Sequence, residues 1–181
     1  MKKFGTAVIL AGGKSSRMGF DKQFLEINGV RLLDNIFNIL SKEFNDLIII
    51  TNKPEEYKNY KARILVDEIK DKGPLAGIYT GLKHAKSEYV FFTPCDIPEF
   101  QKGTAPFFPY LARVKRGCPL LGFYSKRLLE KIKDSIDKDK LSVHKFLQEI
   151  NCLYVETEKD IINLNTREDL KNFYERYDKK E

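Results

Sequence analysis

Residues 6–22 read TAVILAGGKSSRMGFDK, an apolar run followed by two glycines and a polar, basic stretch. A short run that is apolar at every position is typical of a strand buried on both faces, as in a parallel sheet. The glycines let the backbone approach a ligand closely, and consecutive N–H groups can form a nest for an anion. Lys14, Arg17 and Lys22 add positive charge. This stretch predicts a buried first strand that leads into a phosphate-binding loop, with a solvent-exposed basic turn as the alternative.

Two common nucleotide-binding motifs do not fit this loop. Aligning Gly13-Lys14-Ser15 with the last three residues of a Walker A motif puts Val8 where the first glycine must stand. No G-x-G-x-x-G follows the first strand either, so the Rossmann fingerprint is absent. The loop is therefore neither a P-loop nor a dinucleotide-binding turn.

Strands and helices alternate along the first hundred residues. Apolar runs predict further buried strands at 47–51, 62–66 and 89–93. Apolar spacings of 3 and 4 predict a helix over 32–40 that ends near 45–46, and a second helix that starts at Pro74; a short helix is expected at 54–57. Such alternation indicates βαβ units and a parallel sheet. Gly77 and Gly81 each cost the second helix about 1 kcal/mol relative to alanine, which indicates close packing against a strand or a ligand.

Prolines change the pattern after residue 98. Pro106, Pro109 and Pro119 argue against long central strands, so 107–114 and 120–124 predict an antiparallel hairpin at the edge of the sheet. Helices at 126–136 and 142–150, a strand pair at 153–156 and 161–164, and a last helix capped by Thr166 follow. No repeat or linker interrupts the chain. We therefore expect residues 1–181 to form a single Rossmann-like α/β domain with a mostly parallel sheet, helices on both faces and an antiparallel edge hairpin.

The composition indicates the environment of the protein and excludes some classes of partner. No apolar run approaches the roughly 18 to 20 residues of a membrane span, so we expect a soluble protein with no membrane partner. The three cysteines are too scattered for a disulfide framework, which fits a reducing cytoplasm. The net charge of +6 permits an anionic partner, but the basic residues are mixed with 26 acids and form no basic run interleaved with aromatics. We therefore expect no nucleic-acid partner.

Asp96 follows the fourth predicted strand, where open parallel sheets bind ligands. One carboxylate at that place can hold Mg²⁺ together with phosphate oxygens and water. The alternative is a turn-forming aspartate between Pro94 and Pro98. Its neighbour Cys95 is interpreted as a small buried residue rather than a nucleophile, because no motif links either histidine to it.

Four segments, in order, resemble the motifs of one family. Residues 10–22, LAGGKSSRMGFDK, resemble the signature loop of nucleotidyltransferases with a GT-A-like fold, in the form found in molybdenum cofactor guanylyltransferases. GPLAG at 73–77, PCDIP at 94–98 and NLNTREDL at 163–170 are similar to three further motifs of that family. The resemblance spans nearly the whole chain and implies a fold like that of the nucleotide-diphospho-sugar transferases. GPLAG points to the guanylyl branch more than to the cytidylyl branch.

The resemblance implies a GTP site and a magnesium site at matching positions. Leu10, Ala11 and Gly12 would line the guanine and ribose pocket through their backbone, and Gly13 would lie under the triphosphate. Four further positions would bind the nucleotide. Lys22 matches a lysine that contacts phosphate, and Asn52 matches the asparagine after the second strand. Asp67 matches the acid after the third strand, which borders the base and the sugar, and Asp96 is the fourth. Asp96 also matches the metal ligand, and Asn165 falls where related enzymes place a second group beside Mg²⁺. The catalytic residues implied are Arg17, Lys22 and Asp96.

The activity implied is transfer of GMP from GTP to the terminal phosphate of the molybdopterin cofactor, with release of pyrophosphate and with Mg²⁺ as cofactor. Molybdoenzymes or their chaperones would receive the product. Two departures lie on the acceptor side: Cys118-Pro119-Leu120 replaces the usual His-Pro-Leu, and the stretch between Asp96 and Pro119 is shorter than in the family. Alternatives that remain are a nucleotidyltransferase that uses CTP or another phosphorylated acceptor, and a GTP-binding module without catalytic activity.

Overall fold

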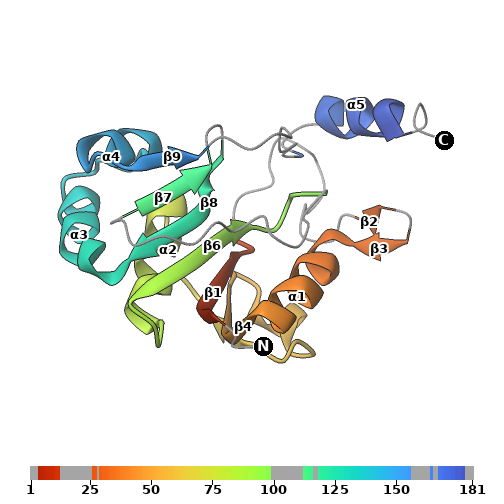
Figure 1. The fold of residues 1–181 in the computed structure, drawn as a ribbon, viewed down its shortest axis with the longest axis horizontal. Coiled ribbons are helices and arrows are strands. Elements are labelled where there is room, and N and C mark those ends of the chain that lie inside the picture. The colour runs from red at the N-terminus through yellow and green to blue at the C-terminus, as the bar shows by residue number, and fades with distance from the viewer. Residues whose placement is uncertain are drawn as a thin grey trace.

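One seven-stranded sheet organises the described part of the chain, which comprises residues 4–12, 26–27, 29–98, 112–115, 118–155, 164 and 167–177 of a computed structural model (Figure 1). The strands are β1 (Phe4–Leu10), β4 (Phe44–Ile50), β5 (Arg63–Leu65), β6 (Tyr89–Pro94), β7 (Ala112–Lys115), β8 (Cys118–Ser125) and β9 (Leu153–Val155). They lie in the order β5-β4-β1-β6-β8-β7-β9. β8 runs antiparallel to both of its neighbours, and the other pairs are parallel. The predicted mostly parallel sheet is thus confirmed.

Helices cover both faces of this sheet. They are α1 (Leu32–Glu43), α2 (Gly73–His84), α3 (Leu129–Asp137) and α4 (Val143–Glu149). The helix α5 (Arg167–Tyr177) belongs to a separate small core, and short 3-10 helices lie at Pro54–Tyr57 and Lys126–Leu128. A separate small hairpin, β2 (Glu26–Ile27) and β3 (Val30–Arg31), leads into α1. The hydrophobic core is split by the sheet: α1 packs on one face, while α2, α3 and α4 pack on the other. This is the layered arrangement that the alternating sequence pattern predicts.

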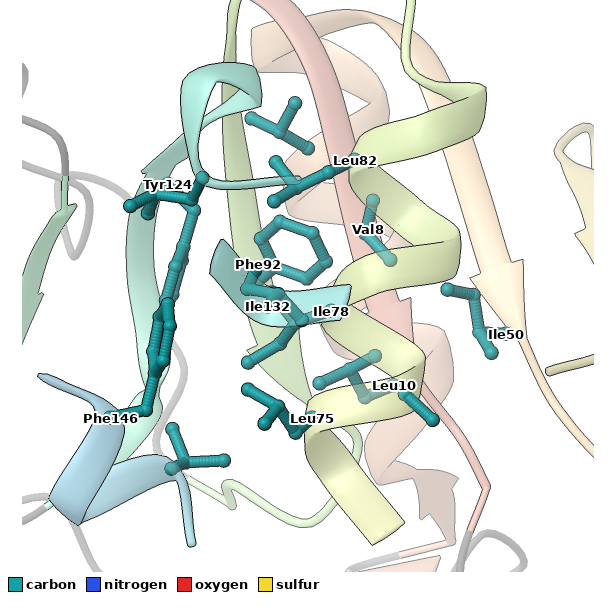
Figure 2. Close-up of a cluster of buried hydrophobic side chains, with 14 of the residues drawn as sticks. Val8, Leu10, Ile50, Leu75, Ile78, Leu82, Phe92, Tyr124, Ile132 and Phe146 are labelled. Atoms are coloured by element: carbon teal, nitrogen blue, oxygen red, sulfur yellow. The ribbon is translucent and has the colours of Figure 1, made fainter. Parts of the chain in front are cut away.

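The position of β1 in the sheet explains why its residues 7–10 are all apolar. Val8 and Leu10 belong to the core on the α2 side, whereas Ala7 and Ile9 belong to the core on the α1 side. Figure 2 shows Val8 and Leu10 against α2, with Leu10 toward the end of the helix that carries Leu75. Because successive side chains of a strand point to opposite faces, a central strand between two helical layers needs apolar residues at both.

The second half of the sheet departs from the prediction in two respects. The antiparallel hairpin of β7 and β8 is confirmed, but its predicted place at the edge is wrong, because β9 pairs with β7 and forms the edge. The expectation that Pro119 excludes a long central strand is wrong, because β8 has eight residues, includes Pro119 and lies between β6 and β7. Pairing with β6 reaches only as far as Gly122, and a bulge between Val114 and Lys115 interrupts pairing with β7. Pro119 therefore sits where the ladder does not require its missing N–H.

Two further boundaries differ from the prediction. The first helix ends at Glu43 and β4 begins directly at Phe44, which pairs with Phe4, so that 45–46 lie in the strand rather than at the end of the helix. Asp46 is accommodated there because Thr6 Oγ1 donates to its carboxylate over 2.9 Å. The last predicted strand at 161–164 and the capping residue Thr166 fall largely outside the described residues; Leu164 alone is described, and it is not in a strand.

The helix α5 packs in a small hydrophobic core that is separate from the two cores on the faces of the sheet. Leu164 and Phe173 pack with Leu32 at the start of α1, and Ile27 of the small hairpin packs against them. Tyr174 also donates a hydrogen bond of 3.4 Å to the carbonyl of Glu26. Among the residues that the structure describes, no helix combines the length and the hydropathy needed to cross a bilayer.

Candidate functional site

The carboxyl ends of β1 and β6 lie side by side, with Leu10 opposite Pro94 in the register. Strands β4 and β5 follow β1 in the chain and lie on one side of it. The next strand, β6, comes after α2 and lies on the other side of β1. This reversal makes the crevice between β1 and β6 a topological switch point, where open α/β sheets bind their ligands. Gly12 and Asp96, which follow these two strands, are thereby placed at that edge.

Gly12 and Asn52 lie next to each other at this edge. The N–H of Ala11 donates to the carbonyl of Ile50 over 2.8 Å, so β1 is held to β4 up to the glycine. Gly12 and Asn52 are both exposed, and a Cβ on Gly12 would lie 3.9 Å from Nδ2 of Asn52. The backbone of Gly12 and the side-chain amide of Asn52, two predicted nucleotide-binding residues, are therefore neighbours on the exposed edge of the sheet.

Asp67 lies on the next strand end, after β5, and it is an unusual carboxylate. Its Oδ1 is buried and has no hydrogen-bond partner among the described residues. Burial raises the pKa of Asp67 above its ordinary value. A Cβ placed on Gly77 would lie 3.0 Å from Cδ2 of Leu10 and 3.5 Å from Oδ1 of Asp67. Leu10 and Asp67 therefore meet at Gly77 of α2. Because Oδ1 of Asp67 is a buried acceptor without a donor, it could accept a hydrogen bond from an N–H or O–H group of a ligand.

Asp96 is half-buried at the end of β6 and is joined to the C-terminal part of the chain. Its backbone carbonyl accepts a hydrogen bond of 3.2 Å from the N–H of Leu164. The residue that precedes Asn165 is therefore held at Asp96. Within the described ranges, no group of three or more His, Cys, Asp or Glu side chains could hold a metal by itself. One carboxylate still suits Mg²⁺, which binds by one or two carboxylates together with phosphate oxygens and water.

The six predicted site residues that the structure describes all lie at one edge of the sheet. Leu10 ends β1, and Ala11 and Gly12 follow it. Asn52 follows β4, Asp67 follows β5 and Asp96 follows β6. The other four, Gly13, Arg17, Lys22 and Asn165, lie outside the described residues. A cavity of about 530 Å³ lies elsewhere, between α3 and α4, and none of the predicted site residues lines it. The candidate site is thus formed by strand ends and not by that cavity.

The cysteines behave as the sequence indicates. All three are free of disulfides, and Cys95 and Cys118 are buried in the core on the α1 side. Cys118, which stands where the resembling family has histidine, is 3% exposed. Cys95 is therefore a packing residue beside Asp96, as predicted.

Sequence reasoning missed the residues that hold the chain just beyond Asp67. The N–H of Glu68 donates to Oγ1 of Thr80 over 3.2 Å, and the Glu68 carboxylate contacts Lys83 and His84 of α2. The sequence pattern assigns no role to either histidine. Only the spacing of Gly77 and Thr80, three residues apart on one helical face, could have suggested that both face the same segment.

Known proteins are similar to this chain over most of its length. Residues 7–152 match the model of the MobA-like NTP transferase domain. A molybdenum cofactor guanylyltransferase from Syntrophotalea carbinolica is 38% identical, covering 94% of this chain and 91% of that protein. A probable molybdenum cofactor guanylyltransferase from Peptoclostridium acidaminophilum is 36% identical, with 95% and 89% covered. The solved structure of molybdopterin-guanine dinucleotide biosynthesis protein A from Archaeoglobus fulgidus shares the fold, with a TM-score of 0.76 at 21% identity and with 96% and 99% covered.

Proposed function

We propose that this chain, which belongs to the MobA-like NTP transferase family, transfers GMP from GTP to the terminal phosphate of the molybdopterin cofactor and releases pyrophosphate. Its relatives at 36% and 38% identity are named for that guanylyltransferase activity. The family membership makes the chain a nucleotidyltransferase. GTP as the donor, molybdopterin as the acceptor and Mg²⁺ as the cofactor are the finer parts of the proposal.

The observation that carries the proposal is the carboxylate of Asp67, which meets Leu10 at Gly77 of α2. Its buried Oδ1 finds no donor within the described part of the chain and faces Leu10 and Gly77. Guanine offers N–H donors on one edge, and the ribose offers hydroxyl donors. A nucleoside bound against Leu10 would supply the missing hydrogen bond and would lead its phosphates toward Gly12 and the signature loop.

The chemistry needs positioning and charge neutralisation rather than a covalent intermediate. The acceptor phosphate is already an anionic nucleophile, so the protein has to align it with the α-phosphorus of GTP. We assign the departing pyrophosphate to Arg17 and to the amides that follow Gly12, and the transferring group to Lys22. Asp96 and Asn165 would hold Mg²⁺, which when bound supplies positive charge to the phosphate oxygens.

The acceptor belongs, in this proposal, to the C-terminal half of the single domain. The GTP and metal residues come from the ends of β1, β4, β5 and β6, so the surface beyond β6, toward β8, β7 and β9, is left for molybdopterin. Cys118, at the start of β8, belongs to that side. We place the protein in the cytoplasm, where its three free cysteines stay reduced and where molybdoenzymes or their chaperones could take up the product.

The acceptor can be tested by product analysis. GTP labelled at the α-phosphate is incubated with the purified protein, Mg²⁺ and one acceptor at a time: molybdopterin, a sugar phosphate or a polyol phosphate. The proposal predicts labelled guanine dinucleotide with molybdopterin alone. Label on a sugar or polyol would retain a nucleotidyltransferase but replace the acceptor, and bound but unconsumed GTP with every acceptor would favour a non-catalytic binding module.

A further inference from the structure

The segment that carries Asp67 leaves the sheet just before that residue. Its last ladder-like bond is from the N–H of Thr51 to the carbonyl of Leu65, at 2.9 Å. Val66, the next residue, is exposed. Beyond this point the segment is a connection that runs to the start of α2, and its position depends on contacts made outside the sheet.

Ile69 of this connection packs against the core on the α2 side. Side chains of α2 supply further contacts through Glu68, the residue after Asp67. Thr80 is completely buried, and its Oγ1 accepts the backbone N–H of Glu68 over 3.2 Å. The carboxylate of Glu68 lies 2.5 Å from Nζ of Lys83 and 2.6 Å from Nε2 of His84. Glu68 is thus held by one backbone bond and by two basic side chains.

These contacts and the Asp67 contact come from one face of α2. Gly77, Thr80 and Lys83 are spaced by three residues, so they follow one another along the helix surface. Gly77 admits Oδ1 of Asp67, and Thr80 and Lys83 hold Glu68. One helical face therefore fixes two consecutive residues of the connection.

We propose that Thr80 and Glu68 are positioning residues of the nucleotide site, which hold the connection after β5 so that the carboxylate of Asp67 stays beside Leu10 and Gly77. The physical reason is that a buried carboxylate oxygen without a donor favours movement outward into water. Residues that hold its neighbour oppose that movement, so the free protein keeps the acceptor where a nucleoside would need it. This inference rests on the proposed function, because it assumes that Asp67 binds the nucleoside.

The positioning role predicts a specific kinetic pattern. Thr80 acts on the nucleoside end of the site, whereas Asp96 and the signature loop are assigned to the phosphates. Loss of the Thr80 hydroxyl should therefore weaken GTP binding and leave the chemical step intact once GTP is saturating.

Thr80→Val is the decisive variant, because valine keeps the shape of the side chain and removes only the acceptor for Glu68. Thr80→Ser keeps the hydroxyl, and Glu68→Gln weakens the contacts with Lys83 and His84. Asp134→Asn is the matched control, since it disturbs an exposed ion pair between α3 and Lys138 that involves neither Glu68 nor Thr80. GTP affinity is measured by titration calorimetry, and KM and kcat by pyrophosphate release, on the full chain with Mg²⁺.

We expect Thr80→Val to raise the dissociation constant and the KM for GTP about tenfold and to leave kcat within about twofold of the wild type. Thr80→Ser and Asp134→Asn should match the wild type, and Glu68→Gln should fall between them. Equal GTP affinity in the wild type and Thr80→Val would overturn the positioning role alone, as would a Thr80→Ser variant as weak as Thr80→Val. A wild-type protein that binds no GTP would overturn the proposed function as well.

Discussion

Gly77 of α2 lies against the carboxylate of Asp67: a Cβ on the glycine would come within 3.5 Å of Oδ1. The same Cβ would approach Cδ2 of Leu10 to 3.0 Å. A helix, the end of the first strand and the connection after β5 therefore converge at one residue that has no side chain. Gly77, the second glycine of GPLAG, accordingly leaves room at the proposed nucleoside site and does not form a turn.

Gly77→Ala should lower the affinity for GTP without unfolding the protein. Alanine is favoured over glycine in a helix by about 1 kcal/mol, which opposes the strain of the 3.0 Å contact with Leu10. We expect a melting temperature close to that of the wild type and an increase of about tenfold in the dissociation constant of GTP, because the added methyl group crowds Leu10 and Asp67. Calorimetric titration and thermal melting measure both quantities, and unchanged GTP affinity would contradict this role.

Gly81→Ala should show the opposite pattern and is the natural counterpart. Its Cβ would lie 2.6 Å from Cε1 of Phe92 and 3.2 Å from Cγ1 of Val8, inside the core. Overpacking of this kind costs about 1–3 kcal/mol, which exceeds the helical gain from alanine. We expect a fall in melting temperature of a few degrees, with the GTP affinity of the folded protein unchanged.

Asp67→Asn should stabilise the protein without ligand while weakening GTP binding. Burial raises the pKa of Asp67, so ionising it in the folded state costs stability. That penalty is absent below the ordinary pKa of about 3.8 and is complete above the raised folded value. The melting temperature of the variant should therefore exceed that of the wild type at pH 7 to 8, and the difference should vanish near pH 3. A variant less stable than the wild type at pH 8 would show that Oδ1 is not an unsatisfied charge.

Asp46→Asn should lower stability and leave the GTP site unaffected. Asp46 is buried in β4, and its carboxylate accepts hydrogen bonds from Thr6 Oγ1 and from Nε and Nη2 of Arg63. Burial acts to raise the pKa of Asp46, but the hydrogen bonds from Arg63 and Thr6 outweigh it, so the pKa lies below its ordinary value. We expect a loss of about 2 kcal/mol at neutral pH.

A carboxyl group whose folded pKa is lowered contributes stability that is present above its unfolded pKa, about 3.8 for Asp46, and is lost as the pH falls through the folded value. The difference in melting temperature between Asp46→Asn and the wild type should therefore be full at pH 5 to 7 and should shrink below about pH 4. A difference that is independent of pH would exclude the ionised carboxylate as its cause.

Asp96→Ala and Lys22→Ala should each lower turnover by orders of magnitude and leave the fold intact. Asp96 follows β6 at the switch point, and Lys22 belongs to the signature loop, so neither side chain is expected to support the core. Circular dichroism reports the fold, and pyrophosphate release at saturating GTP reports turnover. Lys133→Ala, which removes an exposed ion pair with Asp137 on α3, is a suitable control. Near-normal turnover in either purified variant would remove the role assigned to that residue.

Local sequence patterns were sufficient to predict the first half of the fold and to place the described candidate site residues at one edge of the sheet. The apolar runs of β1, β4 and β6 need burial on both faces whatever they pair with, and parallel strands bring their carboxyl ends together. Gly77 and Gly81 were likewise expected to mark close packing, and the structure shows it at Asp67 and at Phe92.

Pairings between distant segments could not be predicted in the same way. Pro119 is compatible with β8 because it belongs to the residues between Cys118 and Gly122 that the register shift leaves without a partner in β7. Strand β9 joins the sheet through a partner forty residues earlier. Among the described residues, Oδ1 of Asp67 has no hydrogen-bond donor, and this depends on how α2 packs against β1. The bond between Glu68 and Thr80 links two residues twelve positions apart that belong to no common motif.

The most direct test is pyrophosphate release by the purified protein with Mg²⁺ and each of GTP, CTP, ATP and UTP, with and without molybdenum-loaded molybdopterin. The account predicts release that requires GTP and molybdopterin together. Equal release with CTP, or release from GTP that is indifferent to molybdopterin, would contradict it.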